Sequence, residues 1–328
     1  MKKTIAIVFY LVFIITLNAN AKEFSLTNGM AGNYAFSPGT GMVGIVAVVH
    51  VGVRNETAAT NGISHYLEHL LFNGTRTLNQ EQLYAAFDEL GVYANAQTGK
   101  DYTAFMIVGR SSDLDTLFGL LREQLFFSTL PFDKFEKEKG IVEQEMLKDE
   151  QDEDYRFNTL FDLHSKSGTP YQYPTLGSRA SIGAITRDQV AQYYHTWFHP
   201  NNVTLLVAAD ASIIEVVSAA KKQLEIVAPG DVPLASKITR VPLTRDRIIE
   251  TAPAKSDANR FKAAIALPTL DSAKQQAALS AAVELFDPQE YLSGTPLRSL
   301  SFELFRDRDF SQLEISGDYS GNLDATAL

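Results

Sequence analysis

Hydrophobic and polar positions alternate with two periods along the chain, one typical of strands and one typical of helices. Three segments rich in apolar and β-branched residues predict strands: 42–53, 101–108 and 203–209. Five segments with apolar residues three or four positions apart predict amphipathic helices: 79–90, 112–127, 132–151, 187–198 and 211–225. Few strand–helix–strand crossovers separate the strands, so we expect an α+β fold in which helices cover an antiparallel or mixed sheet.

A shorter second part follows a break in this pattern. Residues 228–233, Ala-Pro-Gly-Asp-Val-Pro, are typical of a linker. Beyond them, a predicted strand at 260–267 and an alanine-rich helix at 272–286 repeat the strand-then-helix order of the first part, without histidines in the helix. The sequence therefore predicts a larger first domain at 22–227, a linker at 228–240 and a partial, degenerate second repeat at 241–328.

Residues 1–21 have the organisation of a secretory signal peptide. Met1-Lys2-Lys3 is a short basic head, residues 4–17 are apolar, and Ala19-Asn20-Ala21 fits a small-x-small cleavage site. The apolar run is shorter than the roughly 18 residues that a membrane-spanning helix needs. We therefore predict a periplasmic protein, with secretion as the alternative, and no stable membrane span after cleavage. An uncleaved N-terminal anchor is a further alternative.

The composition excludes several kinds of chemistry. The chain has no cysteine, which excludes disulfides, thiolate metal sites and a cysteine nucleophile. Its 39 acidic residues outnumber its 29 lysines and arginines, so that the formal net charge is −10. An acidic chain without a basic run argues against nucleic acid as a partner.

Residues 65–69, His-Tyr-Leu-Glu-His, carry the strongest functional signal. In a helix, where each residue turns by about 100°, His65, Glu68 and His69 project from one face. Two imidazoles one turn apart can bind one metal ion, and a carboxylate beside them can deprotonate a metal-bound water. The motif therefore predicts half of a zinc site suited to hydrolysis. The alternative is a solvated helix face with two unrelated histidines.

The residues around the motif favour such a helix. Thr60 or Asn61 can cap its start, and Asn73-Gly74 can end it in a left-handed turn. An apolar face opposite the motif would anchor the helix in a core and turn the polar face inward or toward a cleft. That apolar face carries Ile63, Leu67, Leu70 and Leu71.

A catalytic zinc ion needs a third protein ligand and an open position for water. A charged helix predicted at 134–150 offers two candidates, because Glu138, Ile141, Val142 and Glu145 fall within about 100° of one another on its surface. Two carboxylates beside an aliphatic pair favour a helix that packs against a charged site. For Glu138, the alternative is an ordinary surface glutamate.

The motif at 65–69, followed by Glu-Lys-Gly-Ile-Val-Glu-Gln-Glu at 138–145, resembles the pitrilysin/insulinase family of inverted-motif zinc metallopeptidases. Four further stretches are similar to this family: Gly52–Glu56, Gly91–Thr98, Leu176–Gly177 and Trp197–Asn202. The resemblance covers residues 42–210 well and the remainder weakly. It implies the family fold, a mostly antiparallel sheet with helices on one face, and the family activity, hydrolysis of peptide bonds.

The resemblance also implies roles for single residues. Asn95 would contact the backbone of a peptide or unfolded-protein substrate. The alternative is an asparagine that forms a turn after Gly91. The implied metal centre consists of His65, His69 and Glu145 as Zn²⁺ ligands, Glu68 as general base and Glu138 as a supporting carboxylate.

The C-terminal part departs from the family pattern. Arg306 matches an arginine that helps family members to hold substrate, but Phe310 and Leu313 replace the glycine and tyrosine that accompany it. Because the second repeat is also short, we expect the chain to resemble the N-terminal part of a longer, four-domain enzyme. A C-terminal half or a homologous subunit would then be a partner. The alternative function is a non-catalytic binding or assembly subunit.

Overall fold

A computed structural model describes residues 21–234, 237–238, 250–253, 259–267, 272–285, 292–306, 308–309 and 311–320. Three predicted features lie wholly or partly outside these residues. They are the predicted signal peptide except for its last residue, part of the predicted linker, and Phe310. By its internal contacts the chain divides into two units: residues up to 144 with 175–234, and residues 145–174 with 235 onward. These units interleave along the chain, and the domain limits expected from the sequence stay a prediction.

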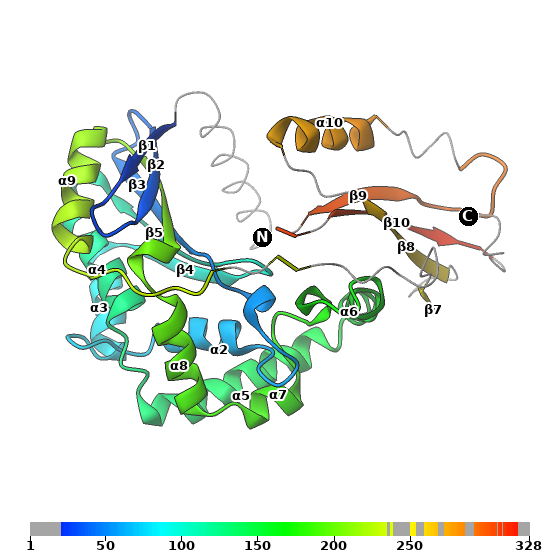
Figure 1. Ribbon diagram of the computed structural model, residues 1–328, viewed down its shortest axis with the longest axis horizontal. Helices are drawn as coiled ribbons and strands as arrows, with labels where there is room; N and C mark the ends of the chain where they lie inside the picture. The colour runs from blue at the N-terminus through cyan, green and yellow to red at the C-terminus, as the bar shows by residue number, and fades with distance from the viewer. Residues whose placement is uncertain are drawn as a thin grey trace. The chain divides into compact units, whose positions relative to one another are not determined.

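A six-stranded sheet forms the centre of the first unit (Figure 1). In sheet order its strands are β1 (Lys22–Ser25), β2 (Ala31–Phe36), β6 (Val203–Ala209), β3 (Met42–Val49), β5 (Thr103–Arg110) and β4 (Tyr93–Thr98). The β2–β6 pair is parallel, and all other neighbours are antiparallel. β3, β5 and β6 correspond to the three predicted strands, whereas β1 and β2 were not expected. β4 lies at one edge of the sheet.

Among the described residues, the helices of the first unit are α2 (Ile63–Leu70), α3 (Gln80–Leu90), α4 (Leu114–Phe126), α7 (Arg179–Ala184), α8 (Arg187–Trp197) and α9 (Ile213–Leu224), and α5 (Phe132–Asp149) begins in this unit. The five helices predicted from periodicity all form, with ends within two residues of the prediction. Several begin at a local side-chain cap, because the side chain accepts a hydrogen bond from the N–H three residues later. These caps are Asn79 for α3, Ser178 for α7, Thr186 for α8 and Ser212 for α9.

The central strands bury every second side chain. In β3, Val43, Ile45, Ala47 and Val49 are fully buried, and the residues between them are partly exposed. β5 and β6 repeat this alternation. Because successive strand residues point to opposite faces, one face of the sheet is covered and the other is more open. The helices α2 and α4 both contact β5, and α2 also contacts β4. The expected α+β fold with an antiparallel-dominated sheet is confirmed.

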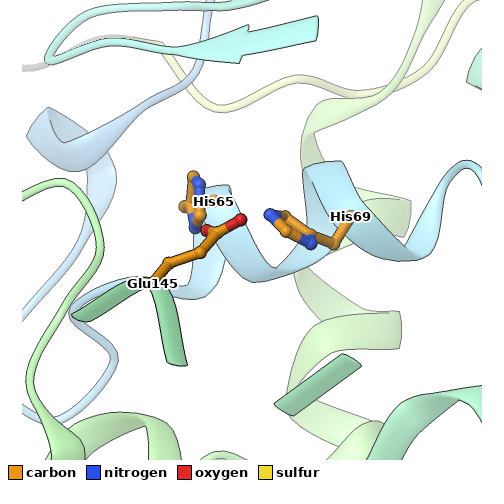
Figure 2. Close-up of side chains that lie close together, drawn as sticks. All are labelled: His65, His69 and Glu145. Atoms are coloured by element: carbon orange, nitrogen blue, oxygen red, sulfur yellow. The ribbon is translucent and has the colours of Figure 1, made fainter. Parts of the chain in front are cut away.

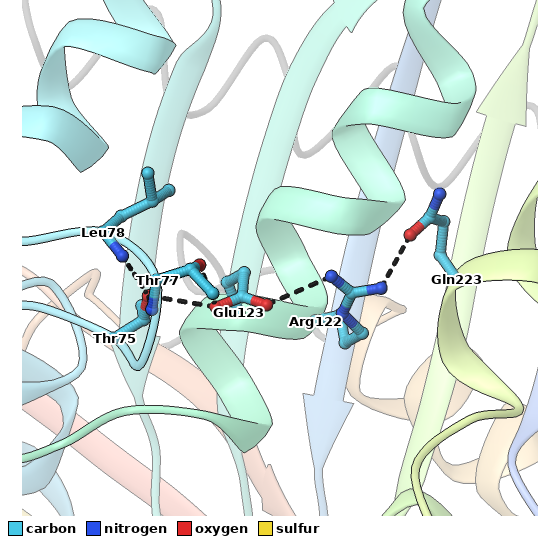
Figure 3. Close-up of polar contacts among 6 residues, drawn as sticks. All are labelled: Thr75, Thr77, Leu78, Arg122, Glu123 and Gln223. Atoms are coloured by element: carbon cyan, nitrogen blue, oxygen red, sulfur yellow. Dashed lines mark hydrogen bonds and ion pairs between the residues drawn. The ribbon is translucent and has the colours of Figure 1, made fainter.

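A buried carboxylate ties the loop between α2 and α3 to α4 (Figure 3). Glu123 of α4 accepts hydrogen bonds from the hydroxyls of Thr75 at 3.0 Å and Thr77 at 2.6 Å. Its other oxygen lies 3.1 Å from Arg122, which also donates to Gln223 of α9 at 2.8 Å. Because Glu123 is only 6 % exposed, water competes weakly for these bonds, and they hold the loop after α2 in one position.

The second unit contains an antiparallel sheet in the order β7 (Glu250–Pro253), β8 (Asn259–Leu267), β10 (Ser311–Tyr319) and β9 (Ser301–Arg306). It also contains α6 (Glu153–Ser165) and α10 (Ala273–Glu284). The sequence predicted β8 and α10 but not α6. At the end of α6, the buried Lys166 pairs with Asp162 at 2.8 Å and lies over the ring of Phe305 at 3.4 Å. α6 therefore packs against this sheet.

Within the part of the chain that the structure describes, none of the helices is both long enough and apolar enough to cross a bilayer.

Candidate metal centre

Helix α2 carries the histidine motif on its less buried face. His65 and His69 are partly exposed, and Glu68 is 9 % exposed. The two imidazole rings lie with their centroids 4.7 Å apart. The polar face predicted from the helical period is therefore present, and an apolar back anchors the helix. The back consists of Ile63, Leu67, Leu70 and Leu71, each at most 1 % exposed.

The start of α2 differs from the prediction. Its N-cap is Gly62, with φ at 91°, instead of Thr60 or Asn61. A Cβ at Gly62 would lie 2.7 Å from the carbonyl oxygen of Leu176, so the close passage of the two backbones requires glycine here. A glycine has no side chain with which to cap the helix. The first N–H groups of α2 must therefore find acceptors elsewhere.

Glu56 supplies these acceptors. One carboxylate oxygen accepts from the N–H of Gly62 at 2.8 Å and from the side-chain amide of Asn61 at 2.9 Å, and the other accepts from the N–H of Ser64 at 3.0 Å. Burial raises the pKa of Glu56 above its usual range, although the hydrogen bonds from Ser64, Gly62 and Asn61 act to lower it. The hydroxyl of Ser64 also lies 2.8 Å from that of Tyr193, which fastens the same turn to α8.

The end of α2 also differs from the prediction. The helix ends at Leu70 in right-handed backbone, not in a left-handed turn at Asn73-Gly74. Asn73 instead donates a hydrogen bond to the carbonyl oxygen of His69 at 2.8 Å and accepts one from Gln80 at 2.7 Å. Gln80 in turn accepts from Lys134 at 2.8 Å. Because Lys134 lies in the first turn of α5, this chain of bonds joins the end of α2 to α5.

Helix α5 brings two carboxylates toward α2. Glu138 is 6 % exposed, and its Oε2 lies 3.2 Å from Nδ1 of His69. This burial excludes the alternative of an ordinary surface glutamate. Val142 is buried as expected, whereas Ile141 is 38 % exposed, so only part of the predicted mixed face packs inward. A hydrogen bond at Nδ1 orients the His69 ring so that Nε2 is the nitrogen suited to bind a metal.

Glu145, two helical turns after Glu138, joins the two histidines (Figure 2). One potential ligand atom from each of His65, His69 and Glu145 lies within 4.8 Å of the others. Figure 2 shows the Glu145 carboxylate directed between the imidazoles. Over the described ranges, this is the one group of three or more histidine or acidic side chains arranged so closely. Two neutral imidazoles and one carboxylate form a donor set of catalytic zinc sites.

The boundary between the two units falls inside α5, after Gln144. α5 is nevertheless one continuous helix from Phe132 to Asp149. The spacing of His65, His69 and Glu145 therefore depends on two helices, α2 and α5.

Glu68 is held by a residue that sequence reasoning missed. Thr98, the last residue of β4, donates a hydrogen bond to Oε2 of Glu68 at 2.5 Å. Thr98 is 8 % exposed and Glu68 is 9 % exposed, so this bond is shielded from water. Sequence reasoning also missed the hydrogen bonds of Glu56 to the start of α2, although the sequence offered a signal for both residues. Glu56 is the last residue of the stretch Gly52–Glu56 and Thr98 is the last residue of Gly91–Thr98, and both stretches resemble a known family.

The two predicted substrate contacts lie in different units. Asn95 is exposed in the middle of the edge strand β4, opposite Met106 of β5, and its side-chain amide donates to the hydroxyl of Tyr93 at 3.1 Å. Its place in a strand excludes the alternative of a turn-forming asparagine. Arg306 is exposed at the end of β9, in the second unit.

Two family models match the chain. The model of insulinase (peptidase family M16) matches residues 35–176, a range that contains α2 and α5. The model of the peptidase M16 inactive domain matches residues 184–288.

Curated relatives extend this likeness. An uncharacterized zinc protease of Bacillus subtilis, YmxG, is 29 % identical over 191 residues, which cover 58 % of this chain and 47 % of the relative. A probable mitochondrial-processing peptidase subunit beta of Schizosaccharomyces pombe is 27 % identical over 215 residues, covering 64 % and 46 %. The chain thus spans about half the length of these relatives.

Solved structures share the fold. A protease from Helicobacter pylori superposes with a TM-score of 0.79 at 21 % identity, covering 94 % of this chain and 77 % of that one. The periplasmic protease PqqL from Escherichia coli gives 0.76 at 18 % identity, covering 92 % and 36 %. At such identities the likeness establishes the architecture.

Proposed function

Because the chain belongs to the insulinase family, peptidase family M16, we propose that it is a zinc-dependent peptidase with a metal site formed by His65, His69 and Glu145. The zinc proteases among its relatives support a peptidase-like function. Family membership alone does not identify the residues that act. The proposal for the site therefore depends on the geometry of this chain.

One observation carries the proposal. The carboxylate of Glu145, from α5, points between two imidazoles of α2, and the three potential ligand atoms lie within 4.8 Å. A solvated helix face with two unrelated histidines does not account for a carboxylate that reaches them from another helix. A metal ion does account for it, because a cation between the three donors satisfies all of them at once.

The residues around the group have distinct proposed roles. When bound there, zinc would polarise the substrate carbonyl and lower the pKa of a water molecule toward neutrality. Glu68, held through Oε2 by Thr98, would accept a proton from that water and pass it to the leaving amine. Glu138 would keep the His69 ring in its ligating orientation through the contact at Nδ1.

We propose peptides or unfolded proteins as substrates. An extended peptide can add to the edge of a sheet through backbone hydrogen bonds, and β4 is such an edge. Asn95, exposed in the middle of β4, would contact the peptide backbone. Arg306 is proposed as a further substrate contact on the resemblance of its segment alone.

The proposed partner is a C-terminal half or a homologous subunit, since the chain spans about half the length of the relatives it matches. The proposed location is the periplasm, with secretion as the alternative, on the signal-peptide pattern of residues 1–21. A periplasmic protease of Escherichia coli shares the fold, which agrees with this location.

A non-catalytic binding or assembly subunit is the second candidate function. The match of residues 184–288 to the inactive-domain model favours it. The match of residues 35–176 to the insulinase model, over the range that contains the complete histidine motif, favours a peptidase.

The test joins metal analysis to peptide digestion, with the full chain alone and with a supplied C-terminal half. The wild type should bind about one zinc per chain and cleave peptides. Glu68→Gln should keep the metal and lose cleavage, whereas His65→Ala and Glu145→Ala should lose the metal. Glu143→Gln, on the same helix as Glu145, is the matched control and should behave as the wild type.

Three results decide between the candidates. Cleavage that survives in Glu68→Gln contradicts the assigned base. Unchanged zinc content in Glu145→Ala contradicts the ligand set. Full zinc content without cleavage, even with a C-terminal half present, favours the binding subunit.

A further inference from the structure

The metal-motif helix begins in a way that sets it apart from its neighbours. α3, α7, α8 and α9 each start at a residue whose own side chain caps the helix. α2, which carries both histidines, starts at Gly62 without a side-chain cap. Its acceptor group comes instead from Glu56, six residues before the N-cap.

The reason is steric. Gly62 and Gly177 both have positive φ, at 91° and 82°, and their backbones pass each other closely. A Cβ at Gly62 would lie 2.8 Å from the Cα of Gly177, and a Cβ at Gly177 would lie 2.5 Å from the carbonyl oxygen of Asn61. The passage therefore excludes a capping side chain at the N-cap, while the buried N–H groups of the first turn still require acceptors.

Glu56 meets this requirement with both carboxylate oxygens. They accept from the N–H groups of Gly62 and Ser64 and from the amide of Asn61, and Glu56 is only 4 % exposed. A carboxylate at the N-terminus of a helix also interacts favourably with the helix dipole. The position of the first turn of α2 thus follows the position of the Glu56 carboxylate.

Glu56 is itself fixed to the turn that follows β4. It comes directly after the 3₁₀ turn Val53–Asn55, where the N–H of Arg54 donates to the carbonyl of Lys100 at 2.8 Å. The N–H of Val53 donates to the carbonyl of Gly99 at 3.3 Å. Thr98, which donates the hydrogen bond to Glu68, immediately precedes Gly99 and Lys100. The backbone at 98–100 therefore supports both the start of α2, through Glu56, and the proposed base, Glu68.

We propose that Glu56 is a positioning residue for the metal group, because it sets where the first turn of α2, and with it His65, lies relative to Glu145. His65 is the third residue of α2, directly after Ser64, whose N–H bonds to Glu56. A shift of this turn changes the separation between a ligand on α2 and a ligand on α5. The inference rests on the proposed function, since it concerns zinc binding by the same three residues.

Glu56→Gln tests the inference in the full chain. It keeps the size of the side chain but turns one acceptor oxygen into an NH₂ group, which then faces N–H donors. The Kd for zinc, measured by competition with a zinc-binding dye, should rise about tenfold, as for other groups that orient metal ligands. Deuterium uptake at the amides of Gly62 and Ser64 should rise as well.

Ser212→Ala is the matched control. It removes the side-chain cap of α9, so it should lower the melting temperature and leave the Kd for zinc unchanged. If Glu56 had a purely structural role, Glu56→Gln would behave like this control, with a lower melting temperature and an unchanged Kd. An increase in Kd that is equally large in Ser212→Ala would come from general destabilisation, and it would also overturn the inference.

The remaining outcomes separate the inference from the proposed function. A wild type that binds no zinc overturns the proposed function and the inference with it. A wild type that binds zinc, with the same Kd in Glu56→Gln, overturns only the inference. If Glu56→Gln does not fold, Glu56→Asp keeps both oxygens on a shorter side chain, and its Kd should rise severalfold; an unchanged Kd in Glu56→Asp overturns the inference.

Discussion

Replacing Glu138 by alanine tests whether this carboxylate supports a metal ligand or is one itself. Its Oε2 lies 3.2 Å from Nδ1 of His69. The side chains of Glu138 and His69 are only 8 % and 17 % exposed, so water competes weakly for this contact. A shielded hydrogen bond to a charged group contributes about 1.5–3 kcal/mol.

The expected loss follows from that figure. If the contact stabilises the ligating orientation of His69, its removal should raise the Kd for zinc about 10- to 100-fold, as is typical for partners of metal-binding histidines. This corresponds to about 1.4–2.7 kcal/mol, which is close to the range expected for the lost hydrogen bond. Glu138→Gln keeps an acceptor oxygen without the charge and should give an intermediate Kd.

Competition between the protein and a zinc-binding dye gives the Kd, and circular dichroism checks that each variant is folded. Glu136→Ala, two residues earlier in α5 with its side chain 69 % exposed, is the control and should match the wild type. A Kd for Glu138→Ala within twofold of the wild type would refute the supporting role. Complete loss of zinc, as expected for Glu145→Ala, would make Glu138 a ligand.

Three further predictions follow from buried or charged contacts. Thr98→Val removes the hydroxyl bonded to the proposed base and should lower kcat about tenfold, some 1.4 kcal/mol, with KM little changed. Thr98→Ser should restore most of the rate, and equal rates in the two variants would exclude this role. Glu123→Ala leaves two threonine hydroxyls without their acceptor and removes one of the two acceptors of the Arg122 guanidinium, so it should lower the free energy of unfolding by about 3 kcal/mol. Urea denaturation followed by Trp197 fluorescence measures this, and a loss below about 1 kcal/mol would contradict it. The hydrogen bond from Lys222 lowers the pKa of Asp115, so this pair stabilises the fold above the usual carboxyl pKa, and the effect disappears as pH falls through the lowered value. Asp115→Asn should therefore melt at a lower temperature than the wild type at pH 7, with the curves converging in acid; a constant difference would show that the ion pair is not responsible.

The central strands and long helices could be predicted because their signal is local. β3, β5 and β6 are apolar and β-branched, and α3, α4, α8 and α9 repeat apolar residues at helical spacing. β1 was missed because it is a short, mostly exposed edge strand that forms only by pairing with β2. α6 was missed because the partners of its buried rings lie far along the chain. Arg260 and Lys262, both in β8, lie over the rings of Phe157 and Phe161.

The candidate site divides in the same way. Helical spacing alone puts His65, Glu68 and His69 on one face, and the structure has them there. The same spacing puts Glu138 and Glu145 on one face of α5 but does not distinguish their environments. Only the packing of α5 against α2 sets Glu138 beside Nδ1 of His69 and Glu145 between the imidazoles.

The start of α2 gives the sharpest contrast between the two levels. Local capping preferences favour Thr60 or Asn61, and the structure uses Gly62 with Glu56 as the distant acceptor. A capping rule considers only nearby residues, whereas the close passage of Gly177 excludes a side chain at this point. The sequence by itself determined which side chains share a helix face, because that depends only on the period of the backbone. The tertiary structure decided which of them meet across elements, because such distances depend on packing between segments far apart in the chain.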